Sequence, residues 1–254
     1  ILKLNSKGEV EWQKTFGGSD YDVAYAVQET TDGGYIVAGC TWSFGTGGSD
    51  AYILKLNSDG SLAWQKTFDE SYVDVANSIQ QTTDGGYIVA VGTESFGAGG
   101  YAYILKLNSD GSLAWQKTFE GGSAYSIQQT TDGGYIVAGY TNSFGAIYRD
   151  AYIVKLNSDG SLAWQKTFGG SNWDEAYSIQ QTADGGYIVA GYTASFGAGS
   201  YDAYVLKLSS DGSLAWQKAF GGNDHEKAYS IQQTTDSGYI VAGYTWSFGA
   251  GYDD

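Results

Sequence analysis

The residues best suited to chemistry are four acids that recur in one register. Asp22, Asp74, Asp174 and Glu226 each stand two residues before an alanine that opens a segment of β-forming residues. Carboxylates gathered in one place could hold a hard cation such as calcium through oxygen ligands. Alternatively, each acid is a turn residue that hydrogen-bonds to nearby backbone and faces solvent. The sequence leaves both interpretations open, and it suggests no cofactor other than calcium.

Aromatic residues in the same loops form a second set of candidates. Trp42 and Trp246 follow the words Tyr-Ile-Val-Ala-Gly-Cys-Thr and Tyr-Ile-Val-Ala-Gly-Tyr-Thr, while Trp173, Tyr21 and Tyr72 lie in the loops that carry the acids. Exposed aromatic rings beside carboxylates and amides suit stacking on sugar rings with hydrogen bonds to their hydroxyl groups. The alternative is that these rings pack between loops. We therefore predict that these five aromatic residues bind a ligand, and we keep packing between loops as the alternative.

Residues for catalysis are scarce. His225 is the only histidine and Cys40 the only cysteine, so a Ser-His-Asp arrangement could occur only once, and no internal disulfide can form. Paired carboxylates could serve a glycoside hydrolase, but such a site needs unique residues in an asymmetric cleft. We predict no catalytic residues and expect the chain not to be an enzyme.

Charge and hydropathy exclude two kinds of partner. The net charge of −15 argues against nucleic acid, because proteins that bind it neutralise phosphates with lysine and arginine. No apolar run approaches the roughly 18 residues that a membrane helix needs, so no membrane insertion is expected.

Internal repeats organise the chain. The sequence motif Trp-Gln-Lys recurs about every 50 residues, beginning at Trp12, Trp64, Trp115, Trp164 and Trp216. One unit contains four predicted strands separated by turn signals, at 176–182, 187–193, 203–208 and 213–220. Apolar residues occur at both alternating sets of positions in each strand, which indicates a sheet covered on both faces.

Four strands per unit and buried sheets predict an all-β fold, a five-bladed β-propeller. A β-solenoid would use shorter repeats, and a β-sandwich would have no reason to repeat so literally. We predict a single domain over 1–254, with blades at about 23–68, 75–119, 124–168, 176–220, and 228–254 together with 1–16.

The two ends of the chain complement each other. Residues 1–16 supply a third and a fourth strand, while residues 228–254 supply a first and a second. Pairing these halves completes the fifth blade, closes the ring and removes unpaired strand edges, which are an aggregation hazard. We expect a monomer, and the alternative is an oligomer in which chains exchange these halves.

The repeated words resemble a known family. The run Gly-Gly-Ser-x-x-Asp-x-Ala-Tyr-Ser-Ile, then Asp-Gly-Gly-Tyr-Ile-Val-Ala-Gly-Tyr-Thr, then Asp-Ala-Tyr-Ile-x-Lys-Leu-Asn-Ser-Asp-Gly is similar to prokaryotic extracellular β-propeller repeats. The resemblance covers the whole chain. It implies an extracellular or cell-surface location and carries no catalytic residues.

Differences among the copies locate the functional candidates. The turns after the first and third strands hardly vary, whereas the loops after the second and fourth strands vary freely. Variable loops on a rigid scaffold are where binding usually occurs. If first strands line a central channel, Asp22, Asp74, Asp174 and Glu226 ring its mouth.

We therefore predict a non-enzymatic binding or display module whose partner is a glycan or a surface protein, with carbohydrate bound at the variable loops. The alternative is a purely structural repeat scaffold, recently amplified or designed. A glycoside hydrolase is a more distant alternative.

Overall fold

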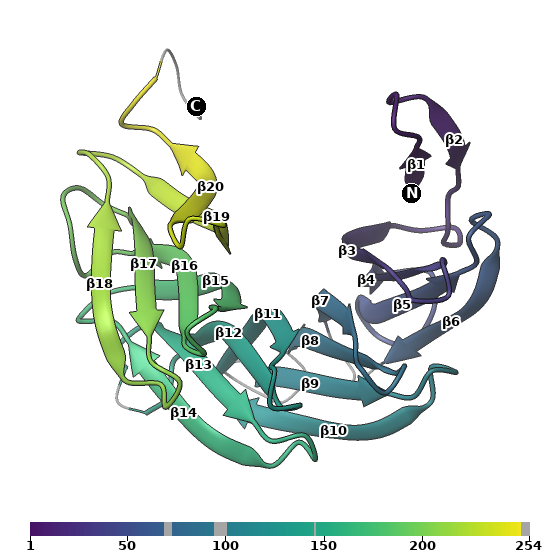
Figure 1. The fold of residues 1–254 in the computed structure, drawn as a ribbon, viewed down its shortest axis with the longest axis horizontal. Helices are drawn as coiled ribbons and strands as arrows, with labels where there is room; N and C mark the ends of the chain where they lie inside the picture. The colour runs from purple at the N-terminus through teal and green to yellow at the C-terminus, as the bar shows by residue number, and fades with distance from the viewer. Residues whose placement is uncertain (69–72, 94–100, 145, 250–254) are drawn as a thin grey trace. The chain divides into compact units, whose positions relative to one another are not determined.

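The computed structural model describes residues 1–68, 73–93, 101–144 and 146–249 (Figure 1). Every regular element among them is a β-strand, which confirms the all-β expectation. No helix long and apolar enough to cross a membrane occurs in this part of the chain. The chain divides into two compact units, Ile1–Thr118 and Phe119–Asp254, and the single domain stays a prediction.

The first unit begins with a hairpin and continues with two four-stranded antiparallel sheets. The hairpin is β1 (Leu2–Leu4) and β2 (Val10–Gln13). The first sheet contains β3 (Asp22–Glu29), β4 (Tyr35–Thr41), β5 (Asp50–Leu56) and β6 (Leu62–Phe68). The second contains β7 (Asp74–Gln81), β8 (Tyr87–Thr93), β9 (Tyr101–Leu107) and β10 (Leu113–Glu120), whose last residues cross the boundary between the units.

The second unit contains two more such sheets and ends with a hairpin. The sheets are β11 (Gly122–Gln129), β12 (Tyr135–Thr141), β13 (Asp150–Leu156) and β14 (Leu162–Phe168), then β15 (Asp174–Gln181), β16 (Tyr187–Thr193), β17 (Asp202–Leu208) and β18 (Leu214–Phe220). The hairpin is β19 (Glu226–Gln233) and β20 (Tyr239–Thr245). In each sheet the strands lie in chain order, as in a propeller blade (Figure 1).

The repeated sequence explains each blade. Gly133 turns the chain between β11 and β12 with φ of 81°, a conformation that costs glycine little. The pleat of β12 then sends Ile136 and Val137 to opposite faces, and both are buried. Because the second and third strands are covered on both faces, a blade requires a neighbour on each side.

The first strands begin earlier than predicted. The sequence predicts that the strand opens at Ala176, but β15 begins at Asp174, so this boundary is wrong. The Asp174 amide donates to the Arg149 carbonyl oxygen at 2.7 Å, and Asp174 is paired with Thr193 of β16. The recurrent acids therefore lie at the ends of strands and not in free turns.

Framework tryptophans join consecutive blades. Trp164 lies with its ring edge against Tyr187 of the next blade, with 5.8 Å between ring centroids. A Cβ placed on Gly212 would be 2.9 Å from the same indole. Trp12 contacts Tyr35 and Gly60 in the same way. These tryptophans are packing residues, as the repeat predicts.

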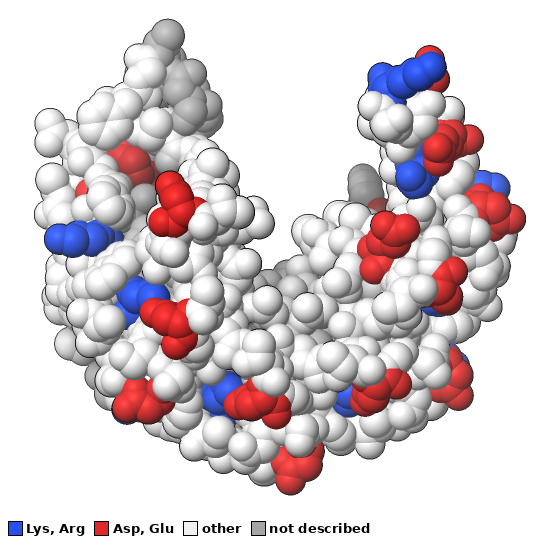
Figure 2. Space-filling model, viewed as in Figure 1, with Lys and Arg blue, Asp and Glu red and all other residues white. Residues whose placement is uncertain are grey.

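In each complete four-stranded sheet, a lysine on the third strand fixes the turn between the first two strands. Lys155 is 5% exposed, and its Nζ lies 2.9 Å from Asp132 Oδ2 and donates to the Leu156 carbonyl. Figure 2 shows atoms of Lys or Arg beside atoms of Asp or Glu at several places on one face. The equivalent pairs are Lys55 with Asp32, Lys106 with Asp84 and Lys207 with Asp184.

The terminal hairpins have the strands of one blade divided between them. Among the described residues, β1–β2 and β19–β20 are each a two-stranded sheet of their own, so ring closure stays a prediction. The burial pattern favours it. Val27 is 62% exposed and Ile240 61%, whereas Ile231 and Ile188, the equivalent residues that pack together, are 5% and 0% exposed.

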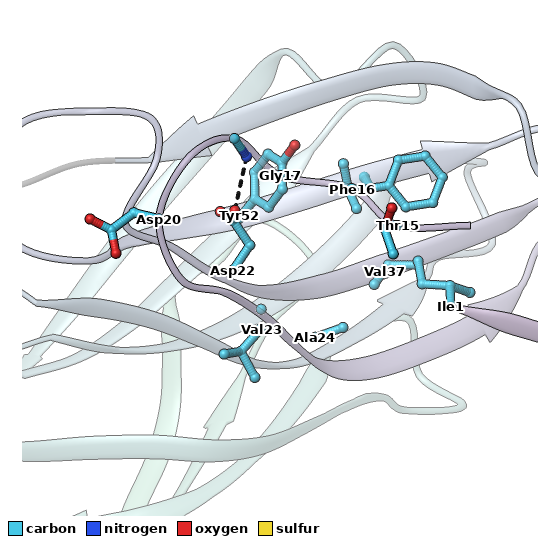
Figure 3. A pocket seen from close by; sticks show the side chains of 13 residues that line it. Ile1, Thr15, Phe16, Gly17, Asp20, Asp22, Val23, Ala24, Val37 and Tyr52 are labelled. Carbon is cyan, nitrogen blue, oxygen red and sulfur yellow. Dashed lines mark hydrogen bonds between the residues drawn. The ribbon is translucent and has the colours of Figure 1, made fainter. Parts of the chain in front are cut away.

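A cavity on the first complete blade agrees with closure. It measures about 380 Å³ and is lined by Ile1, Phe16, Val37, Tyr52 and Leu54, among others (Figure 3). The equivalent face of the next blade is covered by the isoleucine and alanine of the preceding second strand. By the repeat, ring closure would fill this cavity with residues of β20, so we interpret it as one side of a blade interface and not as a ligand site.

Ring closure predicts a specific cross-link. Val37 lies opposite Leu54 in the β4–β5 pairing, so the equivalent residues Val241 and Leu2 should be opposed. In a Cys40→Ala background, Leu2→Cys with Val241→Cys should form a disulfide within one chain, detected by non-reducing electrophoresis and mass spectrometry.

The control replaces Val241→Cys by Ile240→Cys, which points to the opposite face and should not cross-link. Cross-linked dimers would instead show exchange between chains. Failure of both kinds of cross-link would contradict closure.

The lysine–aspartate pairs predict an acid-sensitive contribution to stability. Burial opposes ionisation of Asp132, but hydrogen bonds from Thr130, Lys155 and Gly134 outweigh it and lower its pKa to about 2. This contribution is present above the unfolded-state pKa near 3.8 and is lost as pH falls towards 2. Asp132→Ala, which leaves Lys155 buried without its partner, should lower the unfolding free energy at pH 7 by about 2 kcal/mol.

The measurement is denaturant unfolding at pH 7 and pH 2.5, where the difference from the unmodified protein should shrink. Asp159→Ala, in an exposed hairpin turn, is the matched control and should cost under about 1 kcal/mol. Equal losses for the two variants would show that the buried lysine does not need its partner.

Candidate ligand-binding site

Two variable loops of the same blade are tied together at the ends of their strands. In the last blade, the Asp224 amide donates to Ser247 Oγ at 2.9 Å, and the Trp246 amide donates to the His225 carbonyl at 2.9 Å. Equivalent pairs of bonds join Asp20 and Trp42 to the opposite loop in the first complete blade. Residues in these loops are therefore held by backbone geometry that the repeat supplies.

The recurrent acids brace these loops. Glu226 accepts hydrogen bonds from the Gly222 amide at 2.9 Å and from Thr245 Oγ1 at 2.8 Å. Asp22 likewise accepts from the Gly18 amide and from Thr41 and Ser43. Burial opposes ionisation of both, but these hydrogen bonds outweigh it and hold the pKa of each below its ordinary value.

The four predicted metal-binding acids are divided between the two units. Asp22 and Asp74 belong to the first and Asp174 and Glu226 to the second. Within the ranges described above, no group of three or more histidine, cysteine, aspartate or glutamate side chains is placed to hold a metal. A ring of these four acids at a channel mouth stays a prediction.

A pocket lies beside Trp246, one of the predicted binding residues. The cavity measures about 360 Å³ and is lined by Gly222, Asn223, Asp224, Trp246, Ser247 and Phe248. Trp246 is 40% exposed, and the His225 ring packs against it in a T-shaped arrangement with 4.8 Å between ring centroids. The pocket thus combines an exposed indole with a carboxylate and an amide, the groups expected to bind a polyhydroxylated ligand.

The first complete blade repeats this arrangement. Trp42 is 52% exposed and follows β4 as Trp246 follows β20, and Asp20 stands where Asp224 stands. Tyr21 is 79% exposed, and its carbonyl accepts the Trp42 amide. The structure therefore brings Trp42 and Tyr21 together as predicted residues. Tyr72 lies outside the described residues.

Trp173 has a different setting. The residue after β16 in its blade is Ala194, not tryptophan, and Asn172 replaces the loop aspartate. The Arg149 guanidinium lies over the Trp173 ring at 4.9 Å and over Tyr140 at 4.2 Å. Trp173 is 40% exposed, as Trp246 is, but a neighbouring cation engages its ring. A tryptophan after the second strand and an aspartate in the facing loop occur together in two blades, as Trp42 with Asp20 and as Trp246 with Asp224.

A buried ionic cluster was not predicted from the sequence. Glu175 is 2% exposed, lies 2.6 Å from Arg149 Nη1 and accepts a hydrogen bond from the Tyr125 hydroxyl at 3.4 Å. Lys227 Nζ lies 4.1 Å from the Tyr192 ring centroid. We call these five residues the Glu175 cluster. They come from three consecutive blades.

Burial dominates the electrostatics of the Glu175 cluster. It raises the pKa values of Tyr125 and Tyr192 far above the ordinary range, and the Glu175 charge adds to the effect. Burial also lowers the pKa of Lys227, against the opposing Glu175 charge. Arg149 and Lys227 are the two cations in the otherwise acidic variable loops. Their presence in the sequence is the signal that could have indicated this cluster.

The sole histidine lies behind the pocket. His225 Nε2 is 3.8 Å from Asp224 Oδ1, too far for a hydrogen bond, and its ring lies 4.8 Å from that of Tyr201. Its role in the described structure is therefore to support Trp246 through ring contacts.

The Glu175 cluster predicts a large effect from one truncation. Arg149→Ala leaves a buried carboxylate uncompensated and should lower the unfolding free energy by about 3 kcal/mol, measured by urea unfolding. Adding Glu175→Gln should recover part of the loss.

Lys166→Ala, which removes an exposed cation, is the matched control and should change stability by less than about 0.5 kcal/mol. A loss of similar size for the two single variants would mean that Glu175 does not depend on Arg149.

Comparison with known protein families bears on the fold. The model described as outer membrane protein assembly factor BamB matches residues 49–245, and a beta-propeller domain of unknown function matches residues 30–62. No curated protein sequence is significantly similar to the chain. The two matches agree with the repeated four-stranded sheets.

Solved structures resemble the chain in fold. A protein of unknown function from Dyadobacter fermentans DSM 18053 has a TM-score of 0.59 at 14% identity, covering 96% of this chain and 77% of that one. The WD40 domain of Neurospora crassa Pan2 has a TM-score of 0.51 at 9% identity, covering 87% and 72%. Since WD40 domains are β-propellers, these similarities agree with the fold, and at such identities they show the fold alone.

Proposed function

We propose a function from one premise: the chain belongs to the β-propeller family described as outer membrane protein assembly factor BamB. The chain is a non-enzymatic binding module that takes carbohydrate at the variable loops. Its principal site is the pocket beside Trp246, and the second is the equivalent position at Trp42.

The observation that carries this proposal is the composition of the Trp246 pocket. An indole with 40% of its surface exposed stands beside Asn223 and Asp224, around a cavity of about 360 Å³. An aromatic face stacks on the apolar face of a sugar ring, while carboxylate and amide oxygens accept hydrogen bonds from hydroxyl groups. The loops are already braced by Glu226 and Ser247, so binding requires little ordering.

Repetition of the site supports multivalent binding. Trp42 with Asp20 and Trp246 with Asp224 occupy the same place in two copies of the repeat. Two weak sites on one chain can bind a repetitive surface far more tightly than either site alone. A glycan displayed in many copies is therefore the partner that this arrangement fits best.

The proposal also includes a location outside the cytoplasm, in the cell envelope or at the cell surface. The resemblance to extracellular propeller repeats and the family match support it. The strongly acidic chain would stay soluble there and would avoid anionic surfaces.

A purely structural scaffold is the second candidate. The near-verbatim copies and the ionic bracing within the Glu175 cluster favour it, because they stabilise loops without requiring a ligand. The two candidate functions differ in one property, because only a binding module binds a ligand through Trp246.

The test is a printed array of monosaccharides and oligosaccharides, followed by calorimetry with the best ligand. Trp246→Ala should weaken binding at least tenfold, and the double variant with Trp42→Ala should abolish it. Leu214→Ala, an exposed apolar residue on β18 outside the lining of the pocket, should bind normally.

A gain of binding offers an independent check. Asn172→Asp with Ala194→Trp transfers the two key side chains to a blade with the same loop framework and should raise the binding stoichiometry by one. A blank array, or a Trp246→Ala variant that binds as well as the unmodified protein, would contradict the proposal.

A further inference from the structure

Carboxylates from neighbouring blades meet in pairs in the second unit. Asp150 begins β13, and Asp174 begins β15 of the next blade. A Cβ placed on Gly169 would lie 2.3 Å from Asp150 Oδ1 and 2.7 Å from Asp174 Oδ2. The two carboxylates thus converge on a small space that only a glycine leaves open.

The next junction repeats the arrangement. A Cβ placed on Gly221 would lie 2.3 Å from Asp202 Oδ1 and 2.3 Å from Glu226 Oε2. Asp202 is 2% exposed and Glu226 4% exposed. Two junctions of different local sequence therefore contain the same paired carboxylates beside the same glycine.

The acids of each pair vary together among the copies. Asp50 and Asp74 stand at the same two positions in the first unit, and both are buried. The remaining described copy has Tyr101 and Gly122 there, so both acids are replaced at once. Joint replacement indicates that each acid is of use only with its partner.

The charges are not fully compensated within the chain. Asp174 is completely buried, and its Oδ1 accepts no hydrogen bond, although Oδ2 accepts from the Gly170 amide and Ser195 Oγ. Burial and the charge of the partner raise the pKa of Asp150, and burial and the Glu226 charge do so for Asp202 despite a backbone hydrogen bond from Ala198. A half-buried carboxylate beside a fully buried one, as at Asp150 and Asp174, favours a bound cation or a shared proton.

We propose that each pair binds a divalent cation, calcium, between consecutive blades. One carboxylate comes from the third strand of one blade and one from the first strand of the next. Calcium accepts carbonyl, hydroxyl and water oxygens as further ligands and tolerates irregular geometry, whereas magnesium requires a regular octahedron. A bound ion neutralises the pair and ties two blades together at the variable loops.

The experiment uses the full chain after removal of metal by a chelator. Calcium titration should raise the unfolding midpoint by about 5 °C at a hundred times the dissociation constant. Terbium bound at this site should give luminescence sensitised by Tyr204, because Tyr204 lies near the pair. The charges of Asp174 and Asp150 add to burial in raising the pKa of Tyr204.

Asp150→Asn with Asp202→Asn is the informative variant, since asparagine removes each charge but keeps the side-chain size and an oxygen that can accept the hydrogen bond from the Ala198 amide. Without metal it should be at least as stable as the unmodified protein, because the repulsion is gone, and it should lose most of the calcium and terbium response. Asp159→Asn, in an exposed turn, should keep both responses. No response of the unmodified protein to calcium, as expected for pairs that share a proton, would overturn the proposal. A full response of the double variant would overturn it as well.

Discussion

The structure depends on one constraint: each four-stranded sheet is apolar on both faces and must be covered on both. Ile136 and Val137, adjacent on one strand, are both buried by different neighbours. A single blade would leave both of these faces in water, at a cost of about 25 cal/mol for each Å² of apolar surface. Stability therefore belongs to stacked blades, and framework tryptophans such as Trp164 register each blade on the next. The same constraint is the reason to expect that the two terminal hairpins complete one blade.

Because of this constraint, the two ends of a blade have different roles. At one end of each complete four-stranded blade, an aspartate, a turn glycine and a buried lysine form a constant unit, exemplified by Asp132 and Lys155. At the other end, hydrogen-bonded loops carry the residues that differ, including Trp42 and Trp246. The scaffold is thus uniform where blades must fit one another. It is free to vary where a ligand can reach it, which is why binding is proposed at the variable loops.

Much of the fold could be predicted from the sequence because its determinants are local. Turn glycines, alternating apolar residues and the repeat itself locate the strands, and the second strand of the chosen unit, Tyr187–Thr193, has the predicted bounds. The indoles of Trp42 and Trp246 could also be predicted as candidates, since they lie in loops that vary among the copies.

The pairings between blades could not be predicted in the same way. Glu175 meets Arg149, and Asp174 meets Asp150, because packing brings neighbouring blades into contact. A strand bulge between Ala176 and Ser178 also shifts the alternation that a sequence pattern assumes. Hydrogen bonds to Asp22 and Glu226 show that an acid in a variable loop can serve the scaffold. Side-chain partners decide such roles, and a single sequence does not reveal them.

Amide hydrogen exchange at β20 tests the central claim most directly, because the same molecule contains its own reference. If the fifth blade is completed by the two ends of the chain, the amides of Ile240 and Val241 exchange about as slowly as those of Ile188 and Val189, which lie in a complete blade. Exchange of Ile240 and Val241 at the rate of an unstructured peptide, while Ile188 and Val189 stay protected, would contradict a closed five-bladed ring.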